Sequence, residues 1–361
     1  MRNEMIDILI VDDSAIFRKF LVHIIESAGG MRVAGTASNG IEAIDHIKRA
    51  KPDIILMDIN MPGMDGFDTT AEIMSTVPIP IIIISGEYTP LEVAKTFRAL
   101  EVGAVDILPK PPGPSSPNYN FETQRMVTHI RLMSEIKVVR RDSAVSRKPD
   151  NKAKHENRHD SPTFNPQPYK PPSVIGIGAS AGGPIVIQSL LKGLTPDFDI
   201  PIVIVQHIEP AFAEGFAQWL EMTTGRKVVC ATDGMPLTRG MIVLPPGDSH
   251  LGFKSHDILD VSLEPPKRGL RPSVDHLFLS MANTYGNLCV GIILTGMGRD
   301  GTEGLSFMRE KGAFTIVQDQ ASSMINGMPG EAIKAGAAQR ILSPELMIIC
   351  LNELNSQKNT I

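Results

Sequence analysis

The stretch VIGIGASAGG, residues 174–183, determines how the second half of the chain is interpreted. An apolar run typical of a strand enters a glycine-rich turn, and the spacing of apolar residues beyond it predicts a helix over 183–194. Residues 176–181 (Gly176, Gly178, Ala181) fit the G-x-G-x-x-A pattern of a dinucleotide-binding turn, and residues 178–182 fit G-x-S-x-G, which presents Ser180 as a nucleophile. Both patterns need a strand, a tight turn and a helix. They therefore agree on an α/β fold and differ on the chemistry.

The same alternation continues to the end of the chain. Helical patterns around EGFAQWLEMTTG and GTEGLSFMREKG separate short runs that are apolar throughout. Such runs are typical of parallel strands covered on both faces, so we expect a doubly wound, Rossmann-like, three-layer α/β domain. The further strands are expected at 200–207, 227–231, 241–246, 289–296 and 314–319.

The first half shows a second set of alternating runs, from residue 6 to residue 111. Five strand-like segments separated by amphipathic ones predict a five-stranded, flavodoxin-like sheet in the order 2-1-3-4-5, followed by a helix within 120–141. Residues 142–172 carry few apolar side chains among prolines, polar residues and charges, which is typical of a flexible linker. We therefore expect domains at 1–141 and 173–361, joined by that linker.

Composition restricts the class of protein. The 361 residues are 42% hydrophobic and 21% charged, as in globular domains, and the net charge of −5 without a basic stripe argues against nucleic-acid binding. Three distant cysteines favour neither a disulfide framework nor a zinc knuckle. The acidic N-terminus and the short apolar runs predict neither a signal peptide nor a membrane span, so we expect a cytoplasmic protein.

Acidic and basic residues follow the predicted strands of the first domain. Asp12 and Asp13 close its first strand and Asp58 its third, while Ser85 and Lys110 end the fourth and fifth. Because the carboxyl ends of parallel strands meet at one edge of the sheet, we expect these side chains to converge rather than to be separately solvated. Clustered carboxylates suit Mg²⁺, and a carboxylate beside a hydroxyl and an ammonium can accept a phosphoryl group.

This half of the chain resembles the receiver domain of bacterial two-component response regulators, over roughly residues 5–140. The matching segments are VDDS at 11–14, MDINMPGMDG at 57–66, Ser85 and Lys110-Pro111. One departure is Ile107, because many receivers carry an aromatic switch residue at this position, three before the lysine.

The resemblance implies a role for each of these residues. Asp58 would be the phospho-acceptor, and Mg²⁺ would be bound by Asp13, Asp58 and the Asn60 carbonyl, with Asp12 assisting through water. Ser85 and Lys110 would bind the phosphoryl oxygens.

The dinucleotide pattern in the second domain needs an acid at the end of the next strand, where it would bind the ribose hydroxyls. Gln206 and His207 stand there instead, and Asp197 and Asp199 precede that strand. The cofactor-binding alternative is therefore the less favoured one.

The nucleophile pattern needs a base and an orienting acid near Ser180. His207 lies one βαβ step further along, and Asp300 follows another buried strand in a glycine-rich turn whose N–H groups suit an oxyanion. Taken singly, Ser180 and Asp300 would commonly be helix caps and His207 a surface or core histidine. Their placement together at one sheet edge favours catalysis. His250 with Asp248 is a rival base. The group Asp248, His250, His256 and Asp257 fits no zinc spacing.

The second domain resembles the catalytic domain of the CheB family of chemotaxis methylesterases, over about 173–350. The matching segments are GIGASAGGP, IVQH, RPSVDHLF at 271–278, GIILTGMGRDG and GMPGEAI at 327–333. The resemblance implies Ser180 as nucleophile, His207 as general base and acid, Asp300 as its orienter, and the Met297 backbone N–H as oxyanion donor. Ala181 departs from the Thr or Ser that commonly follows the nucleophile.

The two resemblances together imply a phosphorylation-activated esterase that needs no cofactor for its own chemistry. It would hydrolyse glutamate γ-methyl esters and deamidate glutamines on chemoreceptors, and its receiver would cover the catalytic face until a CheA-type histidine kinase phosphorylates Asp58. Two rival hypotheses are a Rossmann-type NAD-binding protein and a non-catalytic, phospho-regulated adaptor.

Overall fold

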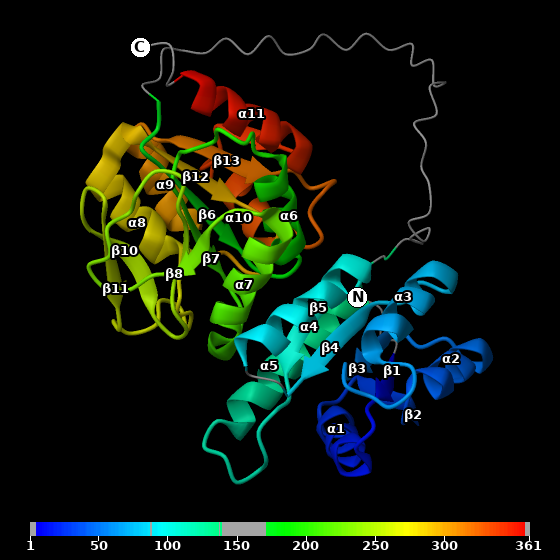
Figure 1. The fold of residues 1–361 in the computed structure, drawn as a ribbon. Helices are drawn as coiled ribbons and strands as arrows, with labels where there is room; N and C mark the ends of the chain where they lie inside the picture. The colour runs from blue at the N-terminus through cyan, green and yellow to red at the C-terminus, as the bar shows by residue number, and fades with distance from the viewer. Residues whose placement is uncertain (1–4, 87–88, 137, 139–170, 358–361) are drawn as a thin grey trace, which may run out of the picture.

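The computed structural model describes residues 5–86, 89–136, 138 and 171–357. Two α/β units make up this part of the chain, and each contains a parallel sheet (Figure 1). The predicted linker 142–172 lies almost wholly outside the described residues, so the domain boundaries stay a prediction.

The N-terminal unit has the predicted five-stranded parallel sheet, in the order β2-β1-β3-β4-β5. The order 2-1-3-4-5 is thereby confirmed. Its strands are β1 (Ile6–Val11), β2 (Met31–Ala37), β3 (Ile54–Met57), β4 (Ile81–Ser85) and β5 (Asp106–Pro109). Its helices are α1 (Ala15–Ser27), α2 (Gly40–Arg49), α3 (Gly66–Thr76), α4 (Pro90–Val102) and α5 (Tyr119–Ser134).

The C-terminal unit has a seven-stranded parallel sheet in the order β14-β13-β12-β6-β7-β9-β8. Its strands are β6 (Val174–Ala179), β7 (Ile202–Gln206), β8 (Val228–Cys230), β9 (Ile242–Leu244), β12 (Cys289–Ile293), β13 (Phe314–Gln318) and β14 (Arg340–Leu342). Two hydrophobic clusters cover its faces and make the predicted three layers. One contains residues of α6 (Gly183–Gly193), α7 (Ala213–Thr224) and α11 (Pro344–Ser356), the other of α8 (Val274–Tyr285), α9 (Thr302–Glu310) and α10 (Gly327–Lys334).

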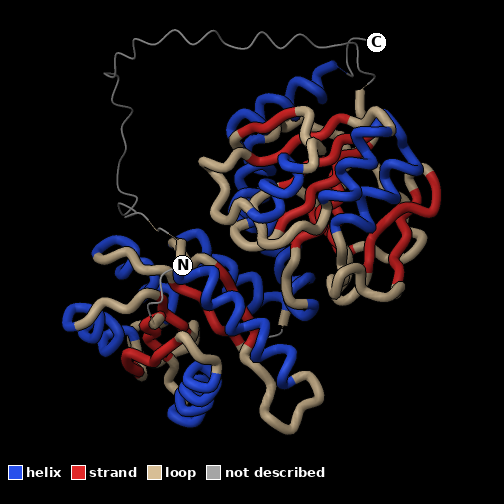
Figure 2. Tube along the Cα trace, turned by 180° about the vertical axis from the view of Figure 1, so that it is seen from behind, coloured by secondary structure: helices blue, strands red, loops and turns tan. Residues whose placement is uncertain are grey.

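Sequence patterns did not predict several parts of this unit: α8, α10, α11, β14 and an antiparallel hairpin of β10 (His250–Ser255) and β11 (Ile258–Ser262). Short 3₁₀ turns at Pro210–Phe212 and Gly286–Leu288 complete it. Figure 2 shows both units from behind, with helices on the two sides of each sheet.

The glycines of VIGIGASAGG have a second physical role in this fold. A Cβ atom added to Gly176 would lie 2.5 Å from Sδ of Met281, and one added to Gly178 would lie 2.2 Å from Cγ1 of Val274. Both neighbours belong to α8, which packs directly on β6. The glycines therefore allow α8 to approach the sheet, in addition to forming the turn.

The two units contact each other through α4 and α7, which lie side by side (Figure 1). Phe97 of α4 stacks on α7, with ring centroids 5.1 Å from Phe216 and 5.5 Å from Trp219. All three rings are buried. Gly215 of α7 permits the contact, because an added Cβ there would lie 2.4 Å from Cβ of Val93.

Candidate functional site

The acidic edge of the N-terminal unit assembles as predicted. Carboxylate oxygens of Asp12, Asp13 and Asp58 lie within 4.8 Å of one another, and Nζ of Lys110 lies 2.8 Å from Asp12 and 3.3 Å from Asp58. The Lys110 N–H donates to the carbonyl of Ser85 at 2.8 Å, which brings the fourth strand end to the same place. Asn60 is exposed just beyond Asp58.

Asp58, like Asp12 and unlike the exposed Asp13, is a buried acid of this group. Burial raises its pKa to about 6; the Lys110 ammonium opposes this rise, and the Asp12 and Asp13 carboxylates add to it. Burial and mutual repulsion destabilise the ionised forms of these carboxylates, and a bound cation would offset both effects. Carboxylate oxygens are ligands that Mg²⁺ prefers, so the donor set fits this ion.

Phe17 is a neighbour of this site that sequence reasoning missed. Nζ of Lys110 lies 4.7 Å from the centre of the Phe17 ring, a cation–π contact. Ile107, the position of the missing aromatic switch, is half-buried and packs against the hydrophobic core. An aromatic side chain that contacts this lysine therefore comes from α1 instead of β5.

The turn that carries Ser180 is fixed by bonds from three segments. The Ser180 N–H donates to the Thr295 carbonyl at 3.1 Å, and the Ser180 carbonyl accepts from Gly183 N–H and from Nε2 of Gln206, each at 2.8 Å. Gln206 occupies the place where the dinucleotide pattern requires an acid. Its amide instead holds the serine turn, which removes the structural basis of the cofactor alternative.

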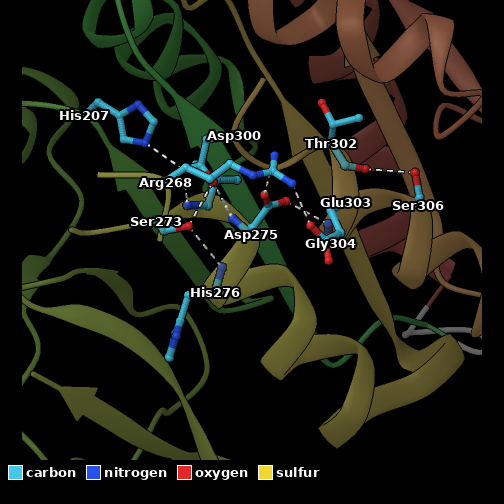
Figure 3. A network of polar contacts seen from close by, with 11 residues as sticks. His207, Arg268, Ser273, Asp275, His276, Asp300, Thr302, Glu303, Gly304 and Ser306 are labelled. Atoms are coloured by element: carbon cyan, nitrogen blue, oxygen red, sulfur yellow. Dashed lines mark hydrogen bonds and ion pairs between the residues drawn. The ribbon is translucent and has the colours of Figure 1, made fainter. Parts of the chain in front are cut away.

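His207 reaches the same edge because β6 and β7 are neighbours, with Ala179 paired to Gln206. The His207 N–H donates to the Ala179 carbonyl at 2.9 Å, and its ring Nε2 lies 2.9 Å from Oδ2 of Asp300 (Figure 3). The predicted adjacency of serine and histidine strands is confirmed. The acid from the β12 turn meets the histidine as well.

Asp300 sits on the N-terminus of α8. Besides His207, its carboxylate accepts from Oγ of Ser273 at 2.8 Å and from the N–H groups of Val274 at 2.6 Å and Asp275 at 3.1 Å (Figure 3). Burial by itself would raise the pKa of Asp300, but the bond and charge of His207 and these N–H groups lower it below its usual value. The acid therefore stays ionised beside the imidazole.

The ring orientation has a consequence for the proton. With Nε2 bound to Asp300, neutral His207 carries its proton there and keeps Nδ1 as the basic nitrogen. Within the described part of the chain, no hydrogen bond joins the Ser180 hydroxyl to His207. Catalytic hydrogen bonds in unliganded enzymes are often long and tighten around the substrate.

The turn before Met297 is held against the serine. The Gly296 N–H donates to Ile325 at 3.0 Å, and the Gly296 carbonyl accepts from Met328 at 2.9 Å. A Cβ added to Gly296 would lie 2.7 Å from Cβ of Ser180, so only glycine allows this approach. Met297 thus follows directly after a contact with Ser180, while its role as oxyanion donor stays a prediction.

The rival base is engaged elsewhere. Nε2 of His250 lies 3.3 Å from the Pro265 carbonyl, and its Nδ1 accepts from Ser273 N–H at 3.2 Å. Asp248 makes a bidentate pair with Arg271 at 3.0 and 2.8 Å. Across the described residues, the only cluster of acids, histidines and cysteines with metal-binding spacing is that of Asp12, Asp13 and Asp58.

A second buried acid, Asp275, lies behind the pair of His207 and Asp300, and sequence reasoning missed it. Burial raises the pKa of Asp275 to about 6; the Gly304 N–H and Arg268 oppose this rise, and the Asp300 charge adds to it. Its position two residues after the α8 N-cap Ser273, in the first turn of the helix, is the sequence signal that points to it.

The N-terminal unit covers the Ser180 turn. Ala181 is 6% exposed and belongs to the same hydrophobic cluster as Met126 and Val127 of α5. Nη2 of Arg125, also on α5, donates to Oε2 of Glu209 at 2.6 Å. Ala181, which differs from the residue expected after the nucleophile, therefore contributes to the contact between the two units.

Comparisons with known proteins identify the family of this chain. Residues 175–351 match the model of the CheB methylesterase family, and residues 8–116 match that of the response regulator receiver domain. A protein-glutamate methylesterase/protein-glutamine glutaminase of Geobacter metallireducens is 42% identical over 98% of this chain and 100% of its own length. The chain belongs to the CheB family.

Other members of the CheB family align over a similar span. One from Methanospirillum hungatei, of the same description, is 42% identical over 98% of this chain and 99% of its own length. The solved catalytic domain of Thermotoga maritima CheB is 32% identical, covers 51% of this chain and 98% of its own, and superposes with a TM-score of 0.49. Membership of an enzyme family favours catalysis over the adaptor hypothesis.

No helix in the described part of this CheB-family chain is both long and apolar enough to cross a lipid bilayer.

Proposed function

We propose that this protein is a phosphorylation-activated serine esterase that hydrolyses glutamate γ-methyl esters on methyl-accepting chemotaxis receptors and deamidates certain glutamines there. The observation that carries the proposal is the 2.9 Å contact between His207 and Asp300 beside the Ser180 turn. Its support from outside the structure is the 42% identity to a protein-glutamate methylesterase/protein-glutamine glutaminase.

The reaction follows from the three side chains. Oγ of Ser180 attacks the ester carbonyl while its proton passes to Nδ1 of His207, and the resulting oxyanion accepts a hydrogen bond from the Met297 N–H. The carbon–oxygen bond to the methoxy group then breaks, and His207 returns the proton to release methanol. Water, deprotonated by His207, attacks the acyl-serine; the bond from the acyl carbon to Oγ of Ser180 breaks, His207 returns the proton to that oxygen, and a glutamate carboxylate leaves. A glutamine would release ammonia by the same steps.

Asp300 stabilises the imidazolium that forms in both halves of this reaction. The lowered pKa of Asp300 keeps this acid ionised throughout the reaction. The proton on Nε2 of His207 therefore stays on the imidazole and is hydrogen-bonded to Asp300. A hollow is lined by the residues on either side of His207, Gln206 and Ile208, and by Pro246 and its neighbours. We place the substrate segment next to the esterified side chain along this hollow.

Control would come from the N-terminal unit, through phosphorylation of Asp58 by a CheA-type histidine kinase. Asp13, Asp58 and the Asn60 carbonyl would hold Mg²⁺, with Asp12 assisting through water, and the ion would neutralise charge at this edge when bound. Ser85 and Lys110 would bind the phosphoryl oxygens. The added charge would reposition both and loosen the contact over the Ser180 turn.

We place the protein in the cytoplasm, where its kinase and the cytoplasmic helices of its receptors would meet it. Cys230, Cys289 and Cys350 are all unpaired, as a reducing compartment favours. The esterase steps use protein side chains and water, so no cofactor takes part in them.

Methanol release from methylated receptor membranes tests the proposal. Ser180→Ala should reduce release by a factor on the order of 10³ or more, because the attacking oxygen is lost. Ser306→Ala is a matched control, because that hydroxyl only caps the Thr302 carbonyl within α9, and it should keep full activity.

Release that persists in Ser180→Ala would overturn the assignment. An adaptor would bind receptors without any methanol release, and an NAD-binding protein would co-purify with nucleotide.

A further inference from the structure

Asp275 is a buried acid that the proposed reaction does not use. Its side chain is 5% exposed and lies in the first turn of α8. Oδ1 accepts from the N–H of Gly304 in α9 at 2.8 Å, and Oδ2 lies 3.6 Å from Nη1 of Arg268. Figure 3 shows Asp275 between Asp300 on one side and Gly304 on the other.

The two acids hold α8 and α9 together reciprocally. Asp300, two residues before α9, accepts from the first turn of α8, and Asp275 in α8 accepts from the first turn of α9. The intervening chain fits closely: Cβ atoms added to Gly301 and Gly304 would lie 2.6 Å from Cγ1 of Val274 and from Cβ of Phe278. The rotation of the Asp300 carboxylate is thus fixed through contacts that include Asp275.

We propose that Asp275 is a positioning residue of the esterase, which orients Asp300 against His207 and whose negative charge favours the protonated histidine in the transition state. This inference rests on the proposed function, since it assigns Asp275 a part in the same triad. Asp275 acts through Asp300 and does not contact the reacting atoms.

The charge part of the proposal depends on the groups that face Asp275. From the β12–α9 turn the carboxylate of Asp300 faces it, from the 263–272 segment the guanidinium of Arg268, and from α9 the carboxylate of Glu303. Arg268 is 42% exposed and also pairs with Glu303 at 2.8 Å, so solvent and a second acid weaken its neutralising effect. Net negative charge therefore remains behind Asp300, on the side away from His207.

A neutral residue would satisfy the hydrogen bond alone. The Gly304 N–H needs only an acceptor, which an asparagine carbonyl also supplies. A buried carboxylate at this place has a destabilised charged form, as its raised pKa indicates. Burying a charge that the packing does not require is typical of functional sites.

The pH dependence of kcat for Asp275→Asn tests the charge. Above pH 7, kcat of the variant should be roughly fivefold lower than that of the wild type, because the imidazolium of His207 loses a stabilising charge. Toward pH 5, where Asp275 of the wild-type protein becomes protonated, the ratio of wild-type to variant kcat should fall to one or below. Glu310→Gln is the matched control: this exposed acid lies at the far end of α9, and its ratio should stay near one at every pH. A ratio that does not change with pH would overturn the proposal.

The pKa of the His207 imidazole, followed by NMR in the full-length Ser180→Ala protein, is a readout that needs no turnover. Adding Asp275→Asn should lower this pKa, whereas an unchanged pKa would overturn the proposal. Should Asp275→Asn fail to fold, the wild-type His207 resonance should still show a second inflection near the protonation of Asp275, and its absence counts against the proposal. A protein without methanol release but with these shifts would refute the proposed function alone.

Discussion

Arg125 of α5 donates a hydrogen bond of 2.6 Å to Glu209, which lies two residues after His207. The N-terminal unit is therefore bonded to the segment that carries the candidate base. The side chains are 30% and 20% exposed, so the ion pair is partly shielded from water. Glu122 lies 3.4 Å from the same guanidinium, and a single cation is thus shared by two acids.

Loss of this ion pair should raise the activity of the unphosphorylated protein. Arg125→Gln removes the charge that holds Glu209, and a partly exposed pair of this kind is worth about 0.5 to 1 kcal/mol. Methanol release without a phosphodonor should therefore rise about two- to fivefold. Arg131→Gln is the matched control on the same helix, because Arg131 donates only to Ala28 and Gly29 of its own unit. Equal release by Arg125→Gln and wild type would contradict a restraining role for the contact.

Gly215→Ala should separate α7 from α4 without unfolding either unit. Alanine favours a helix by about 1 kcal/mol over glycine, so α7 itself should gain stability. The new Cβ would lie 2.4 Å from Cβ of Val93 and 2.8 Å from the carbonyl oxygen of Pro90. Because the Pro90 oxygen belongs to the backbone, it cannot move aside easily. Small-angle scattering should show a larger radius of gyration, together with higher basal esterase activity. Glu221→Ala is the control, because this exposed side chain of α7 does not face α4; it should leave the radius of gyration and the basal activity at wild-type values.

Phosphorylation should act through Asp58. Acetyl phosphate with Mg²⁺ should increase methanol release by the wild-type protein, and Asp58→Asn should abolish that increase because no carboxylate remains to accept the group. The control Asp45→Asn changes an exposed acid of α2 that pairs with Lys48, and it should keep the response. A response that survives Asp58→Asn would place the phosphoryl group elsewhere.

The sheets could be predicted from the sequence because their strands are buried on both faces and appear as uninterrupted apolar runs. The β2-β1-β3-β4-β5 order and the pairing of β6 with β7 followed, and with them the convergence of Ser180 and His207. The helix α8 was missed although Val274, Leu277, Phe278 and Met281 have helical spacing. The glycines of β6 fit a turn by sequence pattern alone, and only the packing of α8 shows their second role, which is to let this helix approach the sheet.

The partners of Asp300 could not be predicted, because they depend on how the consecutive helices α8 and α9 pack against each other. Ser273 and Asp275 lie more than 20 residues before Asp300, and only the packing of α8 on α9 brings them to it. The contact between the units is unpredictable for a similar reason. Phe216 and Trp219 fit the core of their own unit by spacing alone, and nothing local identifies Phe97 as their partner.

Ser273 should contribute to both the stability and the activity, and a second serine separates these effects. Ser273 caps α8 and also donates to Asp300, whereas Ser343 caps α11 with the same kind of bond and lies in a different helix. Each change to alanine should cost about 1 kcal/mol of unfolding free energy. Only Ser273→Ala should also lower kcat, by about tenfold, because Asp300 loses a donor. Equal kcat values for the two variants would exclude an orienting role for Ser273.

Asp275→Asn should increase stability at neutral pH even as it lowers activity. An acid whose folded-state pKa is raised above its unfolded value destabilises the fold when ionised; the penalty is absent below the unfolded pKa and complete above the folded one. For Asp275 this window runs from the ordinary 3.8 to about 6.

The variant has no ionisable group at position 275. Its free energy of unfolding should therefore exceed that of the wild type by roughly 1 to 2 kcal/mol at pH 8, and should equal it at pH 4. Denaturant titrations at the two pH values measure the difference. Because a purely structural acid would be expected to stabilise the fold, a gain in stability paired with a loss of kcat identifies a charge retained for catalysis. A loss of stability at pH 8 would instead assign Asp275 to the packing of α8 on α9.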